Sequence, residues 1–295
     1  MTAKAALTKD VTGLALPAAL LALALAGLAV QLAPLIGPAG PHDPVAPATV
    51  SLPPGTLTYR APGIYMREGR QVDAPLIEVA FEQPLTIMQY QVSAADYARC
   101  VNAGACAPAE PRNRGSGDVP ATGVNYGDAL AYAAWLSAET GQVWTLPSDA
   151  EWAYAAGERF VDDALGLDDS TNPALRWIAD YNREAARKRA ADPVPRALGT
   201  FGANRNGIID LAGNVWEWTD TCHAKLHVDA AGTVFAEAPA CTIRVLQGQH
   251  RTPMSTFIRD ARTGGCSVGA APDNLGFRLV RRPAWHERLF AFFGL

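Results

Sequence analysis

The nine residues from 210 to 218 (DLAGNVWEW) combine residue types that could do chemistry. Glu217 lies between two tryptophans, so its carboxylate is expected among large apolar rings. A buried carboxylate is stable only when hydrogen-bond donors or a cation partner it. The segment therefore predicts one of two arrangements: a metal site, or a rigid corner in which backbone N–H groups or an arginine such as Arg262 or Arg278 satisfy Glu217.

The five cysteines indicate an oxidising compartment. Cys100 and Cys106 flank a short loop that contains glycine, and Cys222 and Cys241 bracket an insertion with Gly, Ala and Pro. Two local disulfides, Cys100–Cys106 and Cys222–Cys241, are the simplest interpretation, with inert reduced thiols as the alternative. Cys266 is left over as a buried inert thiol or a reactive one, and without any CxxC pair a zinc site is not expected.

Composition limits the classes of partner. The chain has 295 residues, 18% of them charged and 49% hydrophobic, with a net charge of -4. These values are typical of a globular protein with one large or two modest domains. The weakly acidic balance gives no electrostatic basis for nucleic-acid binding.

The N-terminal segment predicts a membrane anchor. Lys4 and Lys9 precede a stretch without charges from Val11 to Gly40. We interpret residues 1–10 as cytoplasmic and 11–36 as a transmembrane anchor or uncleaved signal, with a cleaved signal peptide as the alternative. The lysines place the N-terminus inside, so the chain is predicted to be a single-pass inner-membrane protein with its domain in the periplasm, where a protein partner is expected.

The rest of the chain divides into a spacer, a domain and a tail. Residues 37–56 are rich in proline and predict a semi-rigid spacer. We expect a folded domain over 57–282, followed by an amphipathic tail at 283–295 that packs on the domain or touches the membrane surface. Within the domain, a strand is predicted at 85–90 and further short strands at 245–246 and 277–280.

Capping residues predict three helices in the domain. One starts after Ser93, a second covers about 126–140 and stops at Gly141, and a third starts after Ser148, where Glu151 completes a capping box. Residues 162–214 lack a regular hydrophobic period and are predicted to be largely irregular.

Six segments, in this order, resemble the formylglycine-generating enzyme or sulfatase-modifying factor family. The segments are IMQYQVSAADYARCV (87–101), PATGVNYGDALAYAAWLSAETG (120–141), WTLPSDAEWAYAAG (144–157), GTFGANRNGIIDLAGNVWEW (199–218), RVLQG (244–248) and NLGFRLVRR (274–282). The resemblance implies an α+β fold: a single compact domain, distantly like C-type lectins, with little regular secondary structure.

The resemblance also implies calcium at the 210–218 segment. The matching ligands are the carboxylates of Asp210 and Glu217 and the backbone carbonyls of Gly213 and Val215, and a second family site corresponds to Asn182. Such a mixture of carboxylate and carbonyl oxygens suits Ca²⁺. A structural calcium ion is therefore the expected cofactor.

The family's copper chemistry lacks its ligands in this chain. Family enzymes hold Cu(I) between two cysteines, and these positions fall near Pro253 and Ile258 here. No cysteine occurs between Cys241 and Cys266. We therefore expect neither a copper site of this type nor formylglycine-generating activity, and lean towards a protein that is not an enzyme.

Two functional hypotheses remain open. The first is a membrane-tethered accessory or binding domain, and the resemblance includes bacterial members that accompany maturation of respiratory metalloenzymes, particularly in denitrification. The second is an oxidative tailoring enzyme of the same family with altered chemistry. Its candidate catalytic residues surround the expected cleft: His250, Arg251, Ser255, Arg259 and Cys266.

Overall fold

A four-stranded antiparallel sheet joins the beginning and the end of the described chain. Its order is β1 (Thr49–Leu52), β6 (Leu85–Met88), β12 (Val280–Arg282) and β7 (Val143–Thr145). In this sheet β12 lies between β6 and β7, with Val280 opposite both Ile87 and Thr145. The strand nearest the C-terminus therefore occupies the interior of the sheet.

The computed structural model describes residues 46–115, 117–162, 164–166, 173–189, 194–263 and 274–283. The predicted anchor at 11–36, the segment 1–10, Cys266 and all of the tail but Pro283 lie outside these residues. Within the described ranges, every helix is too short or too polar to cross a membrane.

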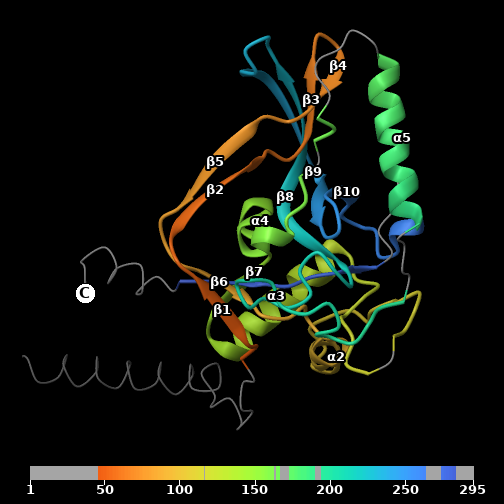
Figure 1. The fold of residues 1–295 in the computed structure, drawn as a ribbon. Helices are drawn as coiled ribbons and strands as arrows, with labels where there is room; N and C mark the ends of the chain where they lie inside the picture. Colours follow the sequence, from red (N-terminus) through yellow and green to blue (C-terminus); the bar gives the residue numbers. More distant parts are fainter. Residues whose placement is uncertain are drawn as a thin grey trace, which may run out of the picture. The chain divides into compact units, whose positions relative to one another are not determined.

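A second, larger sheet is built on a long hairpin. Strands β8 (Trp216–Val228) and β9 (Val234–Gln247) pair antiparallel, with register shifts beside Cys222. β10 (Thr252–Ser255) pairs with β9, while β3 (Ile64–Arg67) and the short β11 (Leu275–Gly276) run parallel to β8, and β4 (Arg70–Val72) pairs with β3. In Figure 1 this hairpin and the β3–β4 hairpin project together from the body.

Strands β2 (Gly55–Arg60) and β5 (Leu76–Phe81) form a separate two-stranded antiparallel ribbon. Because β1 starts at Thr49 and β2 at Gly55, the domain begins inside the segment predicted as a spacer, 37–56. Regular structure thus begins before the predicted domain start at 57. The prolines of this segment lie outside the four residues of β1, so this strand can form its hydrogen bonds with β6.

The capping signals predicted three helices correctly. α2 (Ala94–Asn102) follows Ser93, whose hydroxyl accepts a hydrogen bond from the backbone N–H of Asp96. α3 (Tyr126–Thr140) stops at Gly141, which has a φ of 66°. α4 (Asp149–Ala156) has the predicted capping box. Short 3-10 turns η1 (Gly157–Arg159) and η2 (Ala261–Thr263) complete this set.

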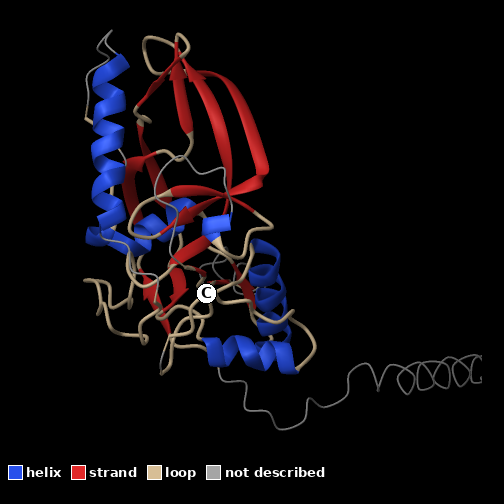
Figure 2. Cartoon of the chain, turned by 90° about the vertical axis from the view of Figure 1, so that its right-hand side faces the viewer, coloured by secondary structure: helices blue, strands red, loops and turns tan. Residues whose placement is uncertain are grey.

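One long helix was missed. α5 (Pro173–Arg189) lies in the region predicted to be irregular. Leu175, Ile178 and Tyr181 recur there at helical spacing, but the Pro, Gly, Asn and Asp residues around them favoured the irregular interpretation. Together with β8 and β9, α5 makes the fold richer in regular structure than predicted, and the arrangement is a mixed α and β fold (Figure 2).

Candidate functional site

Glu217 is the buried centre of the segment that the sequence singled out. Its side chain is 0% exposed. Arg278 donates from Nε to Oε2 at 2.6 Å and from Nη2 to Oε1 at 2.7 Å. Trp152 Nε1 donates to Oε2 and Gln91 Nε2 to Oε1, both at 2.8 Å. Each carboxylate oxygen thus accepts two hydrogen bonds, half of them from a cation.

This geometry favours the arginine alternative over calcium at Glu217. The arginine alternative is the one observed, with Arg278 rather than Arg262 as the partner. Both oxygens already accept two donors, and a guanidinium lies against them, so the carboxylate does not fit as a Ca²⁺ ligand in this arrangement. The sequence could not choose between the two arrangements, because Arg278 reaches Glu217 only when the chain folds back across 61 residues.

Asp210 is satisfied by backbone donors. Its Oδ2 accepts from the N–H of Gly199 at 2.6 Å and its Oδ1 from that of Phe201 at 2.8 Å. Asp210, Ala212 and Asn214 all adopt a positive φ, between 58° and 64°. A non-glycine residue in this region costs energy and persists only where its surroundings impose it. The segment is therefore a strained corner held by its own hydrogen bonds.

Two other calcium candidates, Gly213 and Asn182, have surroundings of their own. The carbonyl of Gly213 accepts from Gln91 Nε2 and from the N–H of Val215. Asn182 lies exposed on α5. Among the described residues, no group of three or more His, Cys, Asp or Glu side chains could hold a metal ion. Calcium elsewhere on the 210–218 segment stays a prediction.

The two positions expected for the copper cysteines carry no thiol and lie in different settings. Pro253 is exposed in β10, opposite Val245 of β9. Ile258 follows in the turn after β10 and belongs to the main hydrophobic core at 9% exposure. A proline on a strand and a buried aliphatic side chain offer a metal no ligand atom.

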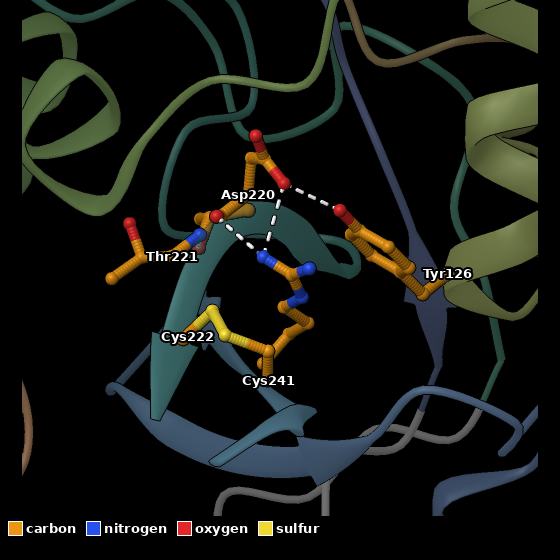
Figure 3. Close-up of a disulfide and its surroundings, with 7 residues drawn as sticks. Tyr126, Asp220, Thr221, Cys222 and Cys241 are labelled. Carbon is orange, nitrogen blue, oxygen red and sulfur yellow. Dashed lines mark hydrogen bonds and ion pairs between the residues drawn. A yellow bond between two sulfur atoms is a disulfide. The ribbon is translucent and has the colours of Figure 1, made fainter. Parts of the chain in front are cut away.

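Both predicted disulfides are present. Cys100 and Cys106 are joined across six residues, and Cys222 and Cys241 across 19 residues at the base of the β8–β9 hairpin (Figure 3). Of the five cysteines, four are therefore bonded, and the fifth, Cys266, lies outside the described residues.

A polar cluster beside the second disulfide was not predicted. The Tyr126 hydroxyl donates to Asp220 Oδ1, and Arg244 Nη1 donates to the Asp220 carbonyl at 2.7 Å and to Oδ1 at 3.1 Å (Figure 3). The Arg244 guanidinium lies 4.5 Å from the centre of the Tyr126 ring. Burial and the bond to Asp220 raise the pKa of Tyr126 to about 12. The phenol thus stays neutral and ties the start of α3 to the hairpin.

His250 packs into the core. It is 5% exposed, its ring meets Trp216 edge to face at 5.3 Å, and its carbonyl accepts from Trp216 Nε1 at 3.1 Å. The indole that flanks Glu217 on one side therefore uses His250 as a packing and hydrogen-bonding partner. In this position His250 contributes to the packing around Trp216.

Arg251 reaches a second buried acid. Its Nε lies 3.5 Å from Oδ1 of Asp149, which is 1% exposed and also accepts from Gln247 Nε2 at 2.6 Å. Burial raises the pKa of Asp149, and Arg251 and Gln247 oppose this rise without cancelling it. Arg251 also donates to the carbonyl of Arg60 and lies 5.5 Å from the ring centre of Tyr59.

Arg259 faces a third environment. Its Nη2 donates to Asp128 Oδ1 at 2.9 Å and its Nη1 to the carbonyl of Pro108 at 3.0 Å. Ser255 is half-buried at the end of β10. His250, Arg251 and Arg259 thus each contact different partners, and the altered-chemistry hypothesis stays a prediction.

Residues 38–283 match the family described as the sulfatase-modifying factor enzyme 1-like domain. The chain belongs to this family. The match covers nearly all of the described fold, including the Glu217–Arg278 corner and both disulfides. The family resemblance inferred from the sequence is thereby confirmed.

Relatives in the sulfatase-modifying factor family include active and inactive proteins. The chain is 37% identical over 182 residues to the formylglycine-generating enzyme of Mycobacterium tuberculosis, covering 56% of this chain and 58% of that protein. It is 28% identical over 187 residues to the inactive C-alpha-formylglycine-generating enzyme 2 of Mus musculus, covering 57% and 53%. The chain thus spans little more than half the length of these relatives.

A solved structure supports the fold. The structure of PvdO from Pseudomonas aeruginosa matches with a TM-score of 0.53 and 25% sequence identity, over 82% of this chain and 96% of that chain. The sulfatase-modifying factor fold therefore extends beyond the segments that align with the curated relatives.

Proposed function

We propose that this chain is a membrane-anchored, extracytoplasmic member of the family that acts as a non-catalytic accessory or binding domain. The observation that carries the proposal is the state of the cysteines. Two disulfides use four of the five cysteines, so a single chain has at most one thiol left, Cys266. A copper site made of two thiolates needs two.

The family scaffold, present without cysteines at the expected copper positions, supports a binding role. The Glu217–Arg278 pair, the capped helices and both sheets remain, while Pro253 and Ile258 stand where the copper ligands are expected. Relatives named as inactive formylglycine-generating enzymes show that the frame also exists in proteins described as inactive. The maturation of a respiratory metalloenzyme, as in denitrification, is the accessory role we propose.

An oxidase assay tests the non-catalytic part. The full chain is incubated with Cu(I), O2 and a cysteine-containing sulfatase peptide, and the peptide is analysed by mass spectrometry. We expect unmodified cysteine and no stoichiometric copper on the protein. An active family enzyme is the positive control. Formylglycine formation that is lost in Cys266→Ser would overturn the proposal.

Fractionation tests the location. Membranes from cells that express the full chain are washed with carbonate, and spheroplasts are treated with protease. We expect the chain to stay with the membranes and its domain to be digested in intact spheroplasts. A chain removed by carbonate or protected from protease would contradict the anchor or its orientation.

Crosslinking tests the partner. Spheroplasts are treated with a crosslinker that cannot enter the cytoplasm, and proteins attached to the chain are identified. We expect a subunit of a respiratory reductase or a protein of its assembly. Recovery of a sulfatase instead would favour a role in sulfatase maturation and contradict the proposal.

A further inference from the structure

Helix α5 carries its apolar side chains outward. Trp177 is 68% exposed and Tyr181 62%, and Ile178 and Leu175 are each 47% exposed. The Trp177 and Tyr181 rings stack at 5.8 Å, as side chains one turn apart on a helix can. An ordinary surface helix turns such residues towards the core.

The opposite side of α5 attaches the helix to the body through polar contacts. Arg176 Nη2 donates to Oδ1 of Asp73 at 3.0 Å, and the N–H of Gly166 donates to Oδ2 of the same carboxylate at 3.0 Å. In Figures 1 and 2 the helix stands at the margin of the fold, beside the β3–β4 hairpin and the long strands. The Arg176–Asp73 ion pair therefore joins α5 to the body, while the apolar side chains of the helix stay exposed.

The charge of α5 contrasts with that of the chain. The helix has five basic and two acidic residues, whereas the whole chain has a net charge of -4. Three of the basic residues, Arg187, Lys188 and Arg189, occupy its last turn. A helix with Trp, Tyr and aliphatic residues on one face and an excess of Lys and Arg is the composition that binds the interface of anionic membranes.

The expected tether would keep the domain near a bilayer. If residues 11–36 form the anchor, about 12 residues separate it from β1, and these span at most about 40 Å when fully extended. The domain is then confined near a surface that carries anionic lipids. Basic residues near such a surface each contribute to binding, and the contribution falls off within a Debye length.

We propose that the exposed face of α5, formed by Leu175, Trp177, Ile178 and Tyr181, docks on the anionic membrane surface and holds the domain in a fixed orientation. This inference rests on the anchor of the proposed function. The aromatic rings enter the headgroup region, and the excess of basic over acidic residues in α5 favours an anionic surface.

Tryptophan quenching by brominated lipids tests the docking. The full chain is reconstituted in nanodiscs that contain phosphatidylglycerol with brominated acyl chains, and its fluorescence is compared with that of Trp177→Phe. We expect a quenched component that disappears in the variant. The double variant Lys188→Glu/Arg189→Glu, discs of phosphatidylcholine alone and high salt should each reduce it. The buried Trp144 provides the matched control, because Trp144→Phe should leave that component unchanged.

Vesicle flotation separates this proposal from the anchor. Wild type and Trp177→Phe should both float with vesicles, because residues 11–36 hold them there. If both float and Trp177→Phe removes no quenching, the α5 proposal is overturned and the anchor stands; a protein partner on α5 would give this result. If neither floats, the anchor is overturned, and the docking that depends on it falls as well.

Discussion

Glu217 and Arg278 form an ion pair without solvent contact, and each partner depends on the other. Replacing Glu217 with Gln leaves the guanidinium buried without its counter-charge, so we expect the free energy of unfolding to fall by about 3–5 kcal/mol. Urea denaturation measures this. Glu68→Gln is the matched control, because the Glu68–Arg70 pair is exposed and should change stability by less than about 1 kcal/mol. Equal effects of the two substitutions would contradict the assigned role.

The Glu217–Arg278 pair also determines the expected effect of a chelator on the melting temperature. Since Arg278 already neutralises Glu217, a chelator in excess should leave the melting temperature of the full chain unchanged. Differential scanning fluorimetry with and without chelator is the measurement. A marked fall in melting temperature that added Ca²⁺ reverses would restore calcium as a structural cofactor of the 210–218 segment.

Part of the Glu217 site could be predicted from the sequence. A glutamate between two tryptophans predicted a buried carboxylate that needs a partner, and this is observed. The choice of Arg278 depended on the placement of β11 beside β8, a contact between distant segments. The polar cluster of Tyr126, Asp220 and Arg244 had no local signal, because its members come from α3, β8 and β9.

At the scale of the element, the disulfide at the base of the β8–β9 hairpin closes the longer of the two loops. Replacing both Cys222 and Cys241 with Ser should lower the free energy of unfolding by about 3 kcal/mol, because the unfolded chain regains the entropy of a loop of about 20 residues. The pair Cys100 and Cys106 closes a shorter loop, and its double serine variant should lose roughly 1 kcal/mol less. Chemical denaturation of both variants gives the comparison, and the opposite ranking would contradict it.

The attachment of α5 should depend on pH through Asp73. Burial acts to raise the pKa of this carboxyl, but hydrogen bonds from the backbone of Leu165 and Gly166 and from Arg176 outweigh it, so the pKa lies below the ordinary 3.8. The stabilisation is therefore complete above the ordinary value and is lost as the pH falls through the lowered value.

Hydrogen exchange, corrected for intrinsic rates, measures this attachment. Protection of α5 amides should be constant above about pH 4 and decline in more acidic solution. Asp73→Asn should lower the protection above about pH 4 and abolish its decline in acid, whereas Asp96→Asn, which alters an exposed pair on α2, should not affect α5. Protection of α5 that Asp73→Asn leaves intact would rule out this attachment.

Helix ends were the most predictable elements, and α5 was the least. Ser93, Ser148 and Gly141 act through hydrogen bonds and backbone angles within a few residues, so their signals are local. α5 has its apolar side chains on the solvent side, and the rule that apolar residues face the core fails there. The early start at β1 escaped notice because strand pairing with β6 is not visible in a proline-rich segment.

At the scale of the whole molecule, the family frame could be predicted because its motifs recur in order along most of the chain. The match over residues 38–283 confirms this frame. The anchor, the periplasmic location and the respiratory partner depend on the cell around the protein, and they stay proposals. The sequence alone shows that no cysteine occurs near Pro253 and Ile258, and the absence of a copper site inferred from this stays a prediction.

The interior position of β12 makes the fold depend on its last described strand. A chain that stops at residue 273 lacks Arg278 and the strand between β6 and β7, so it should not fold cooperatively. A chain that stops at residue 283 keeps every described contact of β12 and should melt as the full domain does. Circular dichroism and thermal melting compare the two, and a cooperative transition in the shorter chain would contradict the prediction.

This topology also sets an order of events during synthesis and export. The strand that joins the two halves of the four-stranded sheet, and the arginine that neutralises Glu217, both leave the ribosome after nearly all of the domain. Until then the Glu217 carboxylate has no fixed counter-charge, and β6 and β7 have no common neighbour. If the domain is exported as proposed, in the order of its synthesis, it would therefore stay loosely folded until residues 278–282 have crossed, and would acquire its final structure only on the far side.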